Sequence, residues 1–141
     1  MMKKCLSLLF AAFLFLSSAQ AEGYDRIDID LYRVSDTILS AMIINMQNSP
    51  DAYRGKVVRM YGELEVARNP ATGIYYFTVQ TADAAACCIY GLDFIWAGNH
   101  AYPEDYGQVG DALTVTGLLD TYEVAGNTYL VLKDAEVVWG F

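Results

Sequence analysis

The chain has 141 residues and carries 17 acidic side chains against nine basic ones, so its formal net charge is −8. A negative surface repels nucleic-acid phosphates and anionic lipid head groups, which argues against nucleic acid as a partner, although solubility alone is the more ordinary role of such charge. The sequence has no Gly-x-Ser-x-Gly motif, no paired metal-ligand histidines and no phosphate-binding loop. We therefore do not expect an enzyme.

Residues 1–21 have the composition of a secretory signal peptide. Two lysines precede an apolar run from Leu6 to Leu16, and the segment closes with Ala19-Gln20-Ala21. Small residues at these positions favour cleavage after Ala21. A retained membrane anchor is the alternative, but a span needs about 20 apolar residues. Cys5 precedes the apolar run and would leave with the signal. We expect an exported protein of net charge −10, since two lysines are lost, with no membrane insertion after cleavage.

Residues 22–33 are acidic and are expected to form a flexible N-terminal segment. From Val34 to Met46 the apolar residues recur at helical spacing, which predicts one amphipathic helix. Ser35 can cap its first turn. Pro50 limits its end, because the residue before a proline avoids the α region. The apolar side of this helix is expected to pack on a core.

After residue 55 the apolar pattern alternates every second residue, as in strands. Five strands are predicted, at residues 56–68, 74–81, 85–96, 112–123 and 128–139, with a turn at 69–73 and a loop at 97–111. Gly62 and Gly117 lie in mid-strand, where glycine permits the sharp coiling of a small barrel. Five antiparallel strands with one added helix describe an OB-fold-like barrel, which we expect to occupy residues 34–141. Its predicted inward-facing residues are Val58, Met60, Leu64, Phe77, Val79, Leu92, Phe94, Val115, Leu119, Leu130 and Leu132.

Several short motifs in the mature chain resemble a group of small exported OB-fold proteins of Gram-positive bacteria that carry a Cys-Cys strand motif. These motifs are Asn45-Met46, Pro50 to Lys56, Cys87-Cys88, Gly91 to Phe94, Tyr102 to Tyr106 and Val115 to Gly117. A more distant similarity is to the OB-like extracytoplasmic domain of permease subunits. The resemblance implies an OB fold, export and an association with a membrane transporter.

Cys87 and Cys88 stand side by side in the third predicted strand. Strand alternation would turn Cys88 inward and Cys87 outward. Three interpretations remain open: two small apolar residues, a strained disulfide between neighbours, or a site for zinc or another soft metal ion. His100, the single histidine, could add a nitrogen ligand and Asp83 or Asp93 an oxygen, but a solvated loop histidine is the more ordinary interpretation.

The outer face of the second and third predicted strands is the candidate ligand surface, because OB barrels bind ligands there. Its predicted residues are Arg59, Tyr61, Tyr76, Thr78, Gln80, Ile89 and Asp93. Tyrosines on such a face can stack on a sugar or a peptide aromatic ring. The alternative is that the helix covers part of this face.

These observations favour a non-enzymatic exported binding or accessory domain, monomeric, with a small ligand or another protein as its partner outside the cell. The alternative is a metal-binding or redox-sensitive module centred on Cys87 and Cys88, with His100 as a further ligand. A structural domain without a ligand is a third hypothesis.

Overall fold

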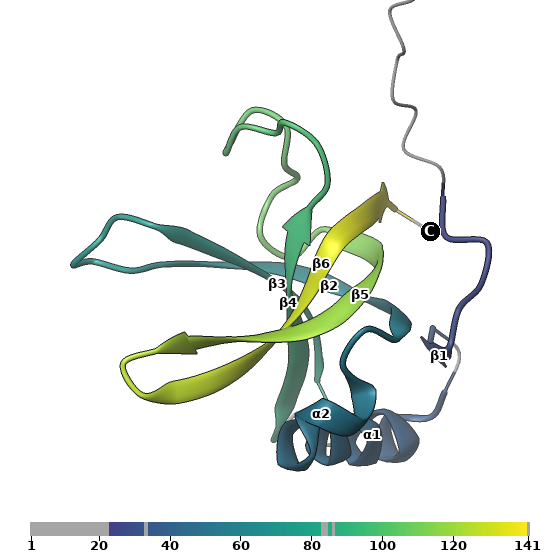
Figure 1. Cartoon of the computed structure of the whole chain (residues 1–141). Helices are drawn as coiled ribbons and strands as arrows, with labels where there is room; N and C mark the ends of the chain where they lie inside the picture. Colours follow the sequence, from purple (N-terminus) through teal and green to yellow (C-terminus); the bar gives the residue numbers. More distant parts are fainter. Residues whose placement is uncertain (1–22, 33, 83–84, 86, 141) are drawn as a thin grey trace, which may run out of the picture.

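The computed structural model describes residues 23–32, 34–82, 85 and 87–140 (Figure 1). The expected signal peptide with Cys5, and also Asp83, lie outside these residues. The described chain is built mainly of β-strands, together with two helices. In chain order its elements are β1 (Ile29–Leu31), α1 (Asp36–Asn48), α2 (Pro50–Tyr53), β2 (Val57–Arg68), β3 (Tyr75–Ala82), β4 (Ile89–Trp96), β5 (Ala112–Val124) and β6 (Asn127–Trp139).

The six strands form one sheet in the order β1-β2-β3-β4-β6-β5, and β2 also pairs with β5. Strand β1 pairs with β2 alone, whereas β2 to β6 form a closed series in which each strand pairs with two others of the series. Four of these pairings are antiparallel, whereas β4 pairs with β6 in parallel. The sequence predicted antiparallel strands throughout, and the parallel pair is a difference with a topological cause. Five strands that pair in a closed series cannot alternate in direction all the way round, so one neighbouring pair must run parallel.

The predicted inward-facing residues form the core. All of them are buried except Phe77, which is half-buried and packs against the core residues. In β6 the backbone of Asp134 adopts a positive φ of 49°, and Ala135 rather than Asp134 is buried. This irregularity changes which residues of β6 point inward, so that Val137 and Trp139 also pack on the core.

The two mid-strand glycines lie where another strand approaches closely. A Cβ atom on Gly62 would lie 2.3 Å from the carbonyl oxygen of Gln80 on β3, and one on Gly117 would lie 2.9 Å from that of Lys133 on β6. Both contacts are with backbone atoms, which cannot move aside as a side chain can. Glycine at these two positions therefore permits tight packing between neighbouring strands.

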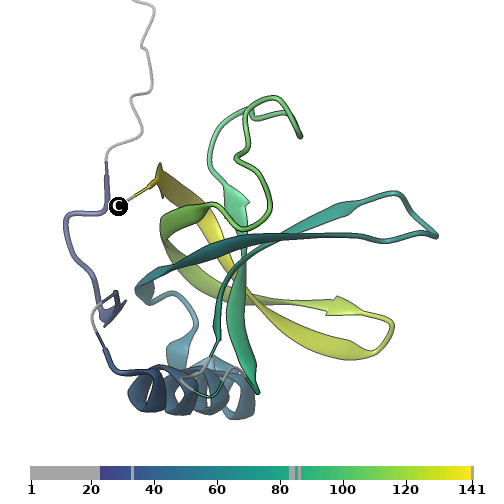
Figure 2. The ribbon, with the colours of Figure 1, turned by 180° about the vertical axis from the view of Figure 1, so that it is seen from behind.

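Helix α1 begins as predicted and closes one end of the sheet. The Ser35 Oγ atom accepts a hydrogen bond from the Ile38 N–H at 3.4 Å, and Leu39, Ile43 and Met46 are buried in the core. The hairpins β2–β3 and β5–β6 project together to one side of the molecule, while the loop at 97–111 lies at the end away from α1 (Figures 1 and 2). The face between the two hairpins is therefore left uncovered by α1.

Part of the segment expected to be flexible pairs with the sheet. Strand β1 runs parallel to β2, with Ile29 opposite Val58. The Asp28 carboxylate accepts a hydrogen bond from the Val57 N–H at 2.9 Å. Three residues are too few for strand alternation to reveal in a sequence, so this sixth strand was not predicted.

Candidate functional site

A pocket of about 470 Å³ is lined by residues of the two projecting hairpins and of the loop at 97–111, and it includes side chains from both faces of β3 and β4. Of its fourteen described lining residues, seven carry Phe, Trp or Tyr rings, so its walls are largely aromatic. The lining residues are Ile74, Tyr75, Tyr76, Phe77, Asp93, Phe94, Ile95, Trp96, Gly98, Asn99, His100, Tyr106, Tyr122 and Val131. They come from β3 and the residue before it, β4, the loop at 97–111, β5 and β6.

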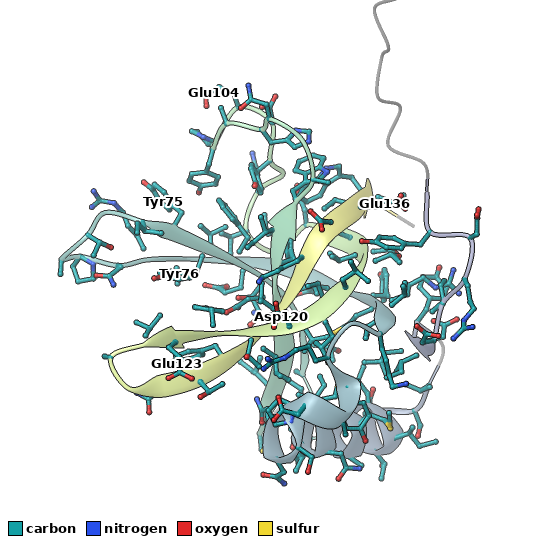
Figure 3. All side chains as sticks on the ribbon, viewed as in Figure 1. Tyr75, Tyr76, Glu104, Asp120, Glu123 and Glu136 are labelled. Carbon is teal, nitrogen blue, oxygen red and sulfur yellow. The ribbon has the colours of Figure 1, made fainter. Side chains whose placement is uncertain are left out.

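Strand alternation in β3 divides two neighbouring tyrosines between the two sides of the β2–β3 hairpin (Figure 3). Tyr75 contacts Tyr102 of the loop, with ring centroids 4.8 Å apart. Tyr76 stacks on Tyr122 of the β5–β6 hairpin, with centroids 5.8 Å apart and an interplanar angle of 13°. Tyr122 stacks in turn on Tyr129, its partner across the hairpin. These contacts between rings fix the positions of the aromatic walls.

Asp93 is the one acidic side chain among the described lining residues, and two hydroxyl groups hold its carboxylate. Thr78 donates a hydrogen bond from Oγ1 to Oδ1 at 2.5 Å, and the Tyr122 hydroxyl donates to Oδ2. Burial, and next the hydrogen bond to Asp93, raise the pKa of Tyr122 above its ordinary value. The Tyr122 hydroxyl therefore remains a donor over the whole physiological pH range.

The loop at 97–111 supplies the remaining wall of the pocket. Tyr106 stacks on Phe77 with centroids 4.1 Å apart, and His100 stacks on Trp96 at 3.7 Å. The His100 Nε2 atom lies 3.0 Å from the carbonyl oxygen of Ala97, which accepts a hydrogen bond from it. Burial raises the pKa of Tyr106, followed by the charge of Asp105. Packing against core aromatic rings thus anchors this loop to the sheet.

The structure divides the predicted ligand surface into separate places. Tyr76, Thr78 and Asp93 come together at the aromatic pocket. Tyr61, Gln80 and Ile89 line a second, smaller cavity of about 290 Å³, together with Gly62, Glu63, Thr81 and Ala82. Alternation along the strands was predicted correctly, but the seven residues do not form a single site.

Arg59 is occupied by the N-terminal segment. Its guanidinium forms a salt bridge with Asp30 and lies 5.3 Å from the centre of the Tyr32 ring. The hydrogen bond to Asp30 is the main cause that raises the pKa of Arg59. Because β1 brings Asp30 next to Arg59 in register, the Arg59 side chain stabilises the attachment of β1 to β2.

The cysteine pair lies outside the regular strand, contrary to the prediction. Pairing between β3 and β4 starts at Ala82 opposite Ile89, so no strand pairing fixes the orientation of the two preceding residues. Both Cys87 and Cys88 are exposed, and the expectation that Cys88 points into the core is wrong. Their sulfur atoms lie 3.6 Å apart, in contact but beyond the length of a disulfide bond.

His100 is not brought to the cysteine pair. The cysteines precede β4 and His100 follows it, and eight strand residues span about 25 Å. Among the residues that the structure describes, no group of three or more His, Cys, Asp or Glu side chains is placed to hold a metal ion. A site made from Cys87, Cys88 and His100 together therefore does not fit this geometry.

The most important residue that the sequence did not indicate is Tyr122. It lies 29 positions after Asp93, and only the pairing of β5 and β6 with the rest of the sheet brings the two together. Its parity in β5, opposite to that of Leu113, Val115 and Leu119, is the one sequence signal that could have placed it on the outer face.

A further hollow of about 540 Å³ lies beside Tyr106 and Trp139. Its two carboxylates have structural roles: Asp105 accepts a hydrogen bond from the Ala101 N–H at 2.6 Å, and Asp111 accepts one from the Gln108 N–H at 2.8 Å. These hydrogen bonds shape the loop at 97–111 and do not point to a ligand.

Over the described part of the chain, no helix combines the length and the apolar character that a membrane crossing requires. A comparison with known proteins finds no family model and no curated protein that matches the chain.

Proposed function

We propose that this chain is an exported, non-enzymatic binding or accessory domain with an OB-fold-like barrel, and that its ligand occupies the aromatic pocket. The closed series of pairings from β2 to β6 supports the barrel. In an OB fold, ligands bind over the second and third barrel strands and the loops that flank them. Those strands correspond to β3 and β4 here, and the flanking loops to the tips of the two projecting hairpins.

The observation that carries this proposal is the pocket on that face, with its aromatic walls and one carboxylate. Ligand sites are typically concave, largely apolar and equipped with few polar groups. Stacked rings and Asp93 would bind a ligand with flat apolar surfaces and a hydrogen-bond donor. Such a ligand is a small molecule, a peptide or the outer part of a membrane transporter with which the domain associates.

The proposal is tested by following backbone amide signals of the mature protein by NMR while a panel of sugars, short peptides and small amines is added. We expect one class to shift signals from β3, β4 and the loop at 97–111. Tyr76→Ala should then weaken its binding at least ten-fold. Tyr61→Ala, which removes a tyrosine from the smaller cavity, is the matched control and should bind like the parent. If both variants lose affinity equally, the ligand does not bind in the aromatic pocket.

A second candidate function is a thiol module at Cys87 and Cys88, supported by the 3.6 Å contact between their exposed sulfur atoms. Two thiolates this close can bind one soft ion together. This site and the aromatic pocket lie at opposite ends of β4, so each can be tested without disturbing the other.

A further inference from the structure

We infer that the ligand of the aromatic pocket is cationic, and that an extended peptide segment of a partner carries the positive group as an Arg or Lys side chain. This inference rests on the proposed function, because it names the chemical class that the same pocket selects. Three features of the described residues carry it: the charge of the lining, the partners of Asp93 and the strand edges beside the pocket.

The lining favours positive charge. Among its fourteen described residues, Asp93 is the single Asp or Glu, and there is no Lys or Arg. The faces of aromatic rings carry partial negative charge and attract guanidinium and ammonium groups. The chain as a whole has a net charge of −8, which raises the local concentration of cations further. An anionic ligand would meet repulsion from each of these sources.

Asp93 is held in place but its charge is not neutralised. Thr78 and Tyr122 supply hydroxyl donors, and within the described residues no Lys or Arg forms a salt bridge with it. Asp120 provides the contrast, because Lys133 lies 2.6 Å from its Oδ2 and Arg54 lies 3.3 Å from its Oδ1. A carboxylate oxygen can accept two hydrogen bonds, so each oxygen of Asp93 keeps one position for a ligand cation.

Two strand segments beside the pocket have a partner strand on one side only. Tyr75 and Tyr76 pair with β2, while the pairing of β3 with β4 starts at Phe77. Residues 127–130 of β6 pair with β5, while the pairing with β4 starts at Val131. An extended peptide can add to such an edge through its own backbone. Exposed apolar side chains at Ile74, Ile95 and Tyr129 would contact its neighbouring residues.

The experiment compares two blocked pentapeptides, acetyl-Thr-Val-Arg-Val-Thr-amide and the same peptide with citrulline in place of arginine. Citrulline keeps the shape and most donors of arginine but has no charge, so the pair isolates the cation. Acetyl-arginine-amide alone tests the contribution of the peptide backbone. Affinities are measured by calorimetry and by NMR on the mature protein, at low salt and at 150 mM salt.

We expect the arginine peptide to bind at least ten-fold more tightly than the citrulline peptide, to bind more tightly than acetyl-arginine-amide, and to weaken with salt. Asp93→Asn keeps the size of the side chain and should abolish the preference for arginine. Glu104→Gln makes the same change of net charge at the exposed tip of the loop and should leave the preference intact (Figure 3).

If the parent protein binds the arginine and citrulline peptides with equal affinity, the ligand is not selected for its positive charge and the inference is wrong. If acetyl-arginine-amide binds as tightly as the arginine peptide, the ligand is not an extended peptide. If neither peptide shifts signals from the pocket, the inference is wrong. In that case a sugar or another neutral ligand from the panel that binds there would still support the proposed binding function, which keeps the two failures distinguishable.

Discussion

The hydroxyl of Tyr122 on β5 donates a hydrogen bond to the carboxylate of Asp93 on β4. The same tyrosine stacks on Tyr76 of β3. The Tyr122 side chain therefore connects the β5–β6 hairpin both to Asp93 and to the β2–β3 hairpin. The separation between the hairpins is therefore set by contacts within the protein. We expect a ligand to enter with little rearrangement of the backbone.

Removal of the Tyr122 hydroxyl should loosen the pocket. Tyr122→Phe keeps the ring and its stacking but takes one donor from Asp93. A hydrogen bond to a charged group contributes about 1.5–3 kcal/mol, and Asp93 is only half-buried. We therefore expect the free energy of unfolding to fall by about 1–2 kcal/mol. Urea denaturation measures this change. A variant as stable as the parent would show that water replaces the hydroxyl without loss.

The same variant should alter stability at alkaline pH. Since the pKa of Tyr122 is raised in the folded protein, its contribution to stability is full below about pH 10, the ordinary tyrosine value, and is lost as pH rises further. Stability of the parent should therefore fall above pH 10, and Tyr122→Phe should fall less steeply. The stability of the variant should still decline above pH 10, though by less, because the pKa values of Tyr24 and Tyr106 are also raised in the folded protein. Identical slopes in parent and variant would contradict the assignment.

Phe94→Ala should destabilise the fold by about 3–5 kcal/mol, because Phe94 is only 2% exposed and its removal leaves a cavity in the core. The neighbouring Ile95 is 57% exposed, so Ile95→Ala is the matched control and should change stability by less than about 1 kcal/mol. Thermal or urea unfolding compares the two. A loss below about 1 kcal/mol for Phe94→Ala, like that expected for Ile95→Ala, would contradict the buried position of Phe94.

Cys87→Ser and Cys88→Ser should each cost less than about 1 kcal/mol of stability, since both side chains are exposed. If the pair forms one soft-metal site, either substitution alone should remove the binding of copper(I) or zinc, measured by titration of the reduced protein. Two variants that bind metal like the parent would eliminate the thiol module and leave the cysteines as surface residues.

The protein should show no measurable affinity for single-stranded DNA at physiological salt. Single-strand binding needs a basic groove, and the described lining of the pocket has no Lys or Arg. Fluorescence anisotropy with a labelled oligonucleotide provides the measurement. Micromolar binding that weakens with salt would contradict both this prediction and the proposed cationic ligand.

The sequence allowed the regular elements to be predicted because alternation and caps are local signals. Ser35 caps α1 as expected, although the helix runs to Asn48 rather than Met46. The predicted strands match β2 to β6 to within one residue, except that the third was expected to start at residue 85 and β4 starts at Ile89. Cys88 was misplaced for a physical reason. Alternation assigns faces only within a paired strand, and the ladder begins at Ile89. That these strands form an OB-fold-like barrel stays a prediction.

The site was predictable only in part. Tyr76, Thr78 and Asp93 are found from alternation along two adjacent strands. Tyr122 depends on the arrangement of distant strands, and the loop wall of Tyr106 and His100 depends on stacking onto Phe77 and Trp96. No periodic pattern in a single sequence encodes such contacts, because each joins residues whose spacing follows from tertiary packing.

The position of the cysteine pair before β4, with the aromatic pocket extending past the far end of that strand, offers a practical handle. A maleimide linker on Cys87 or Cys88 would attach the protein to a sensor chip or bead in one orientation, through the end of β4 that lies away from the loop at 97–111. Immobilised in this way, the domain would present its pocket to solution, where binding of candidate partners could be measured.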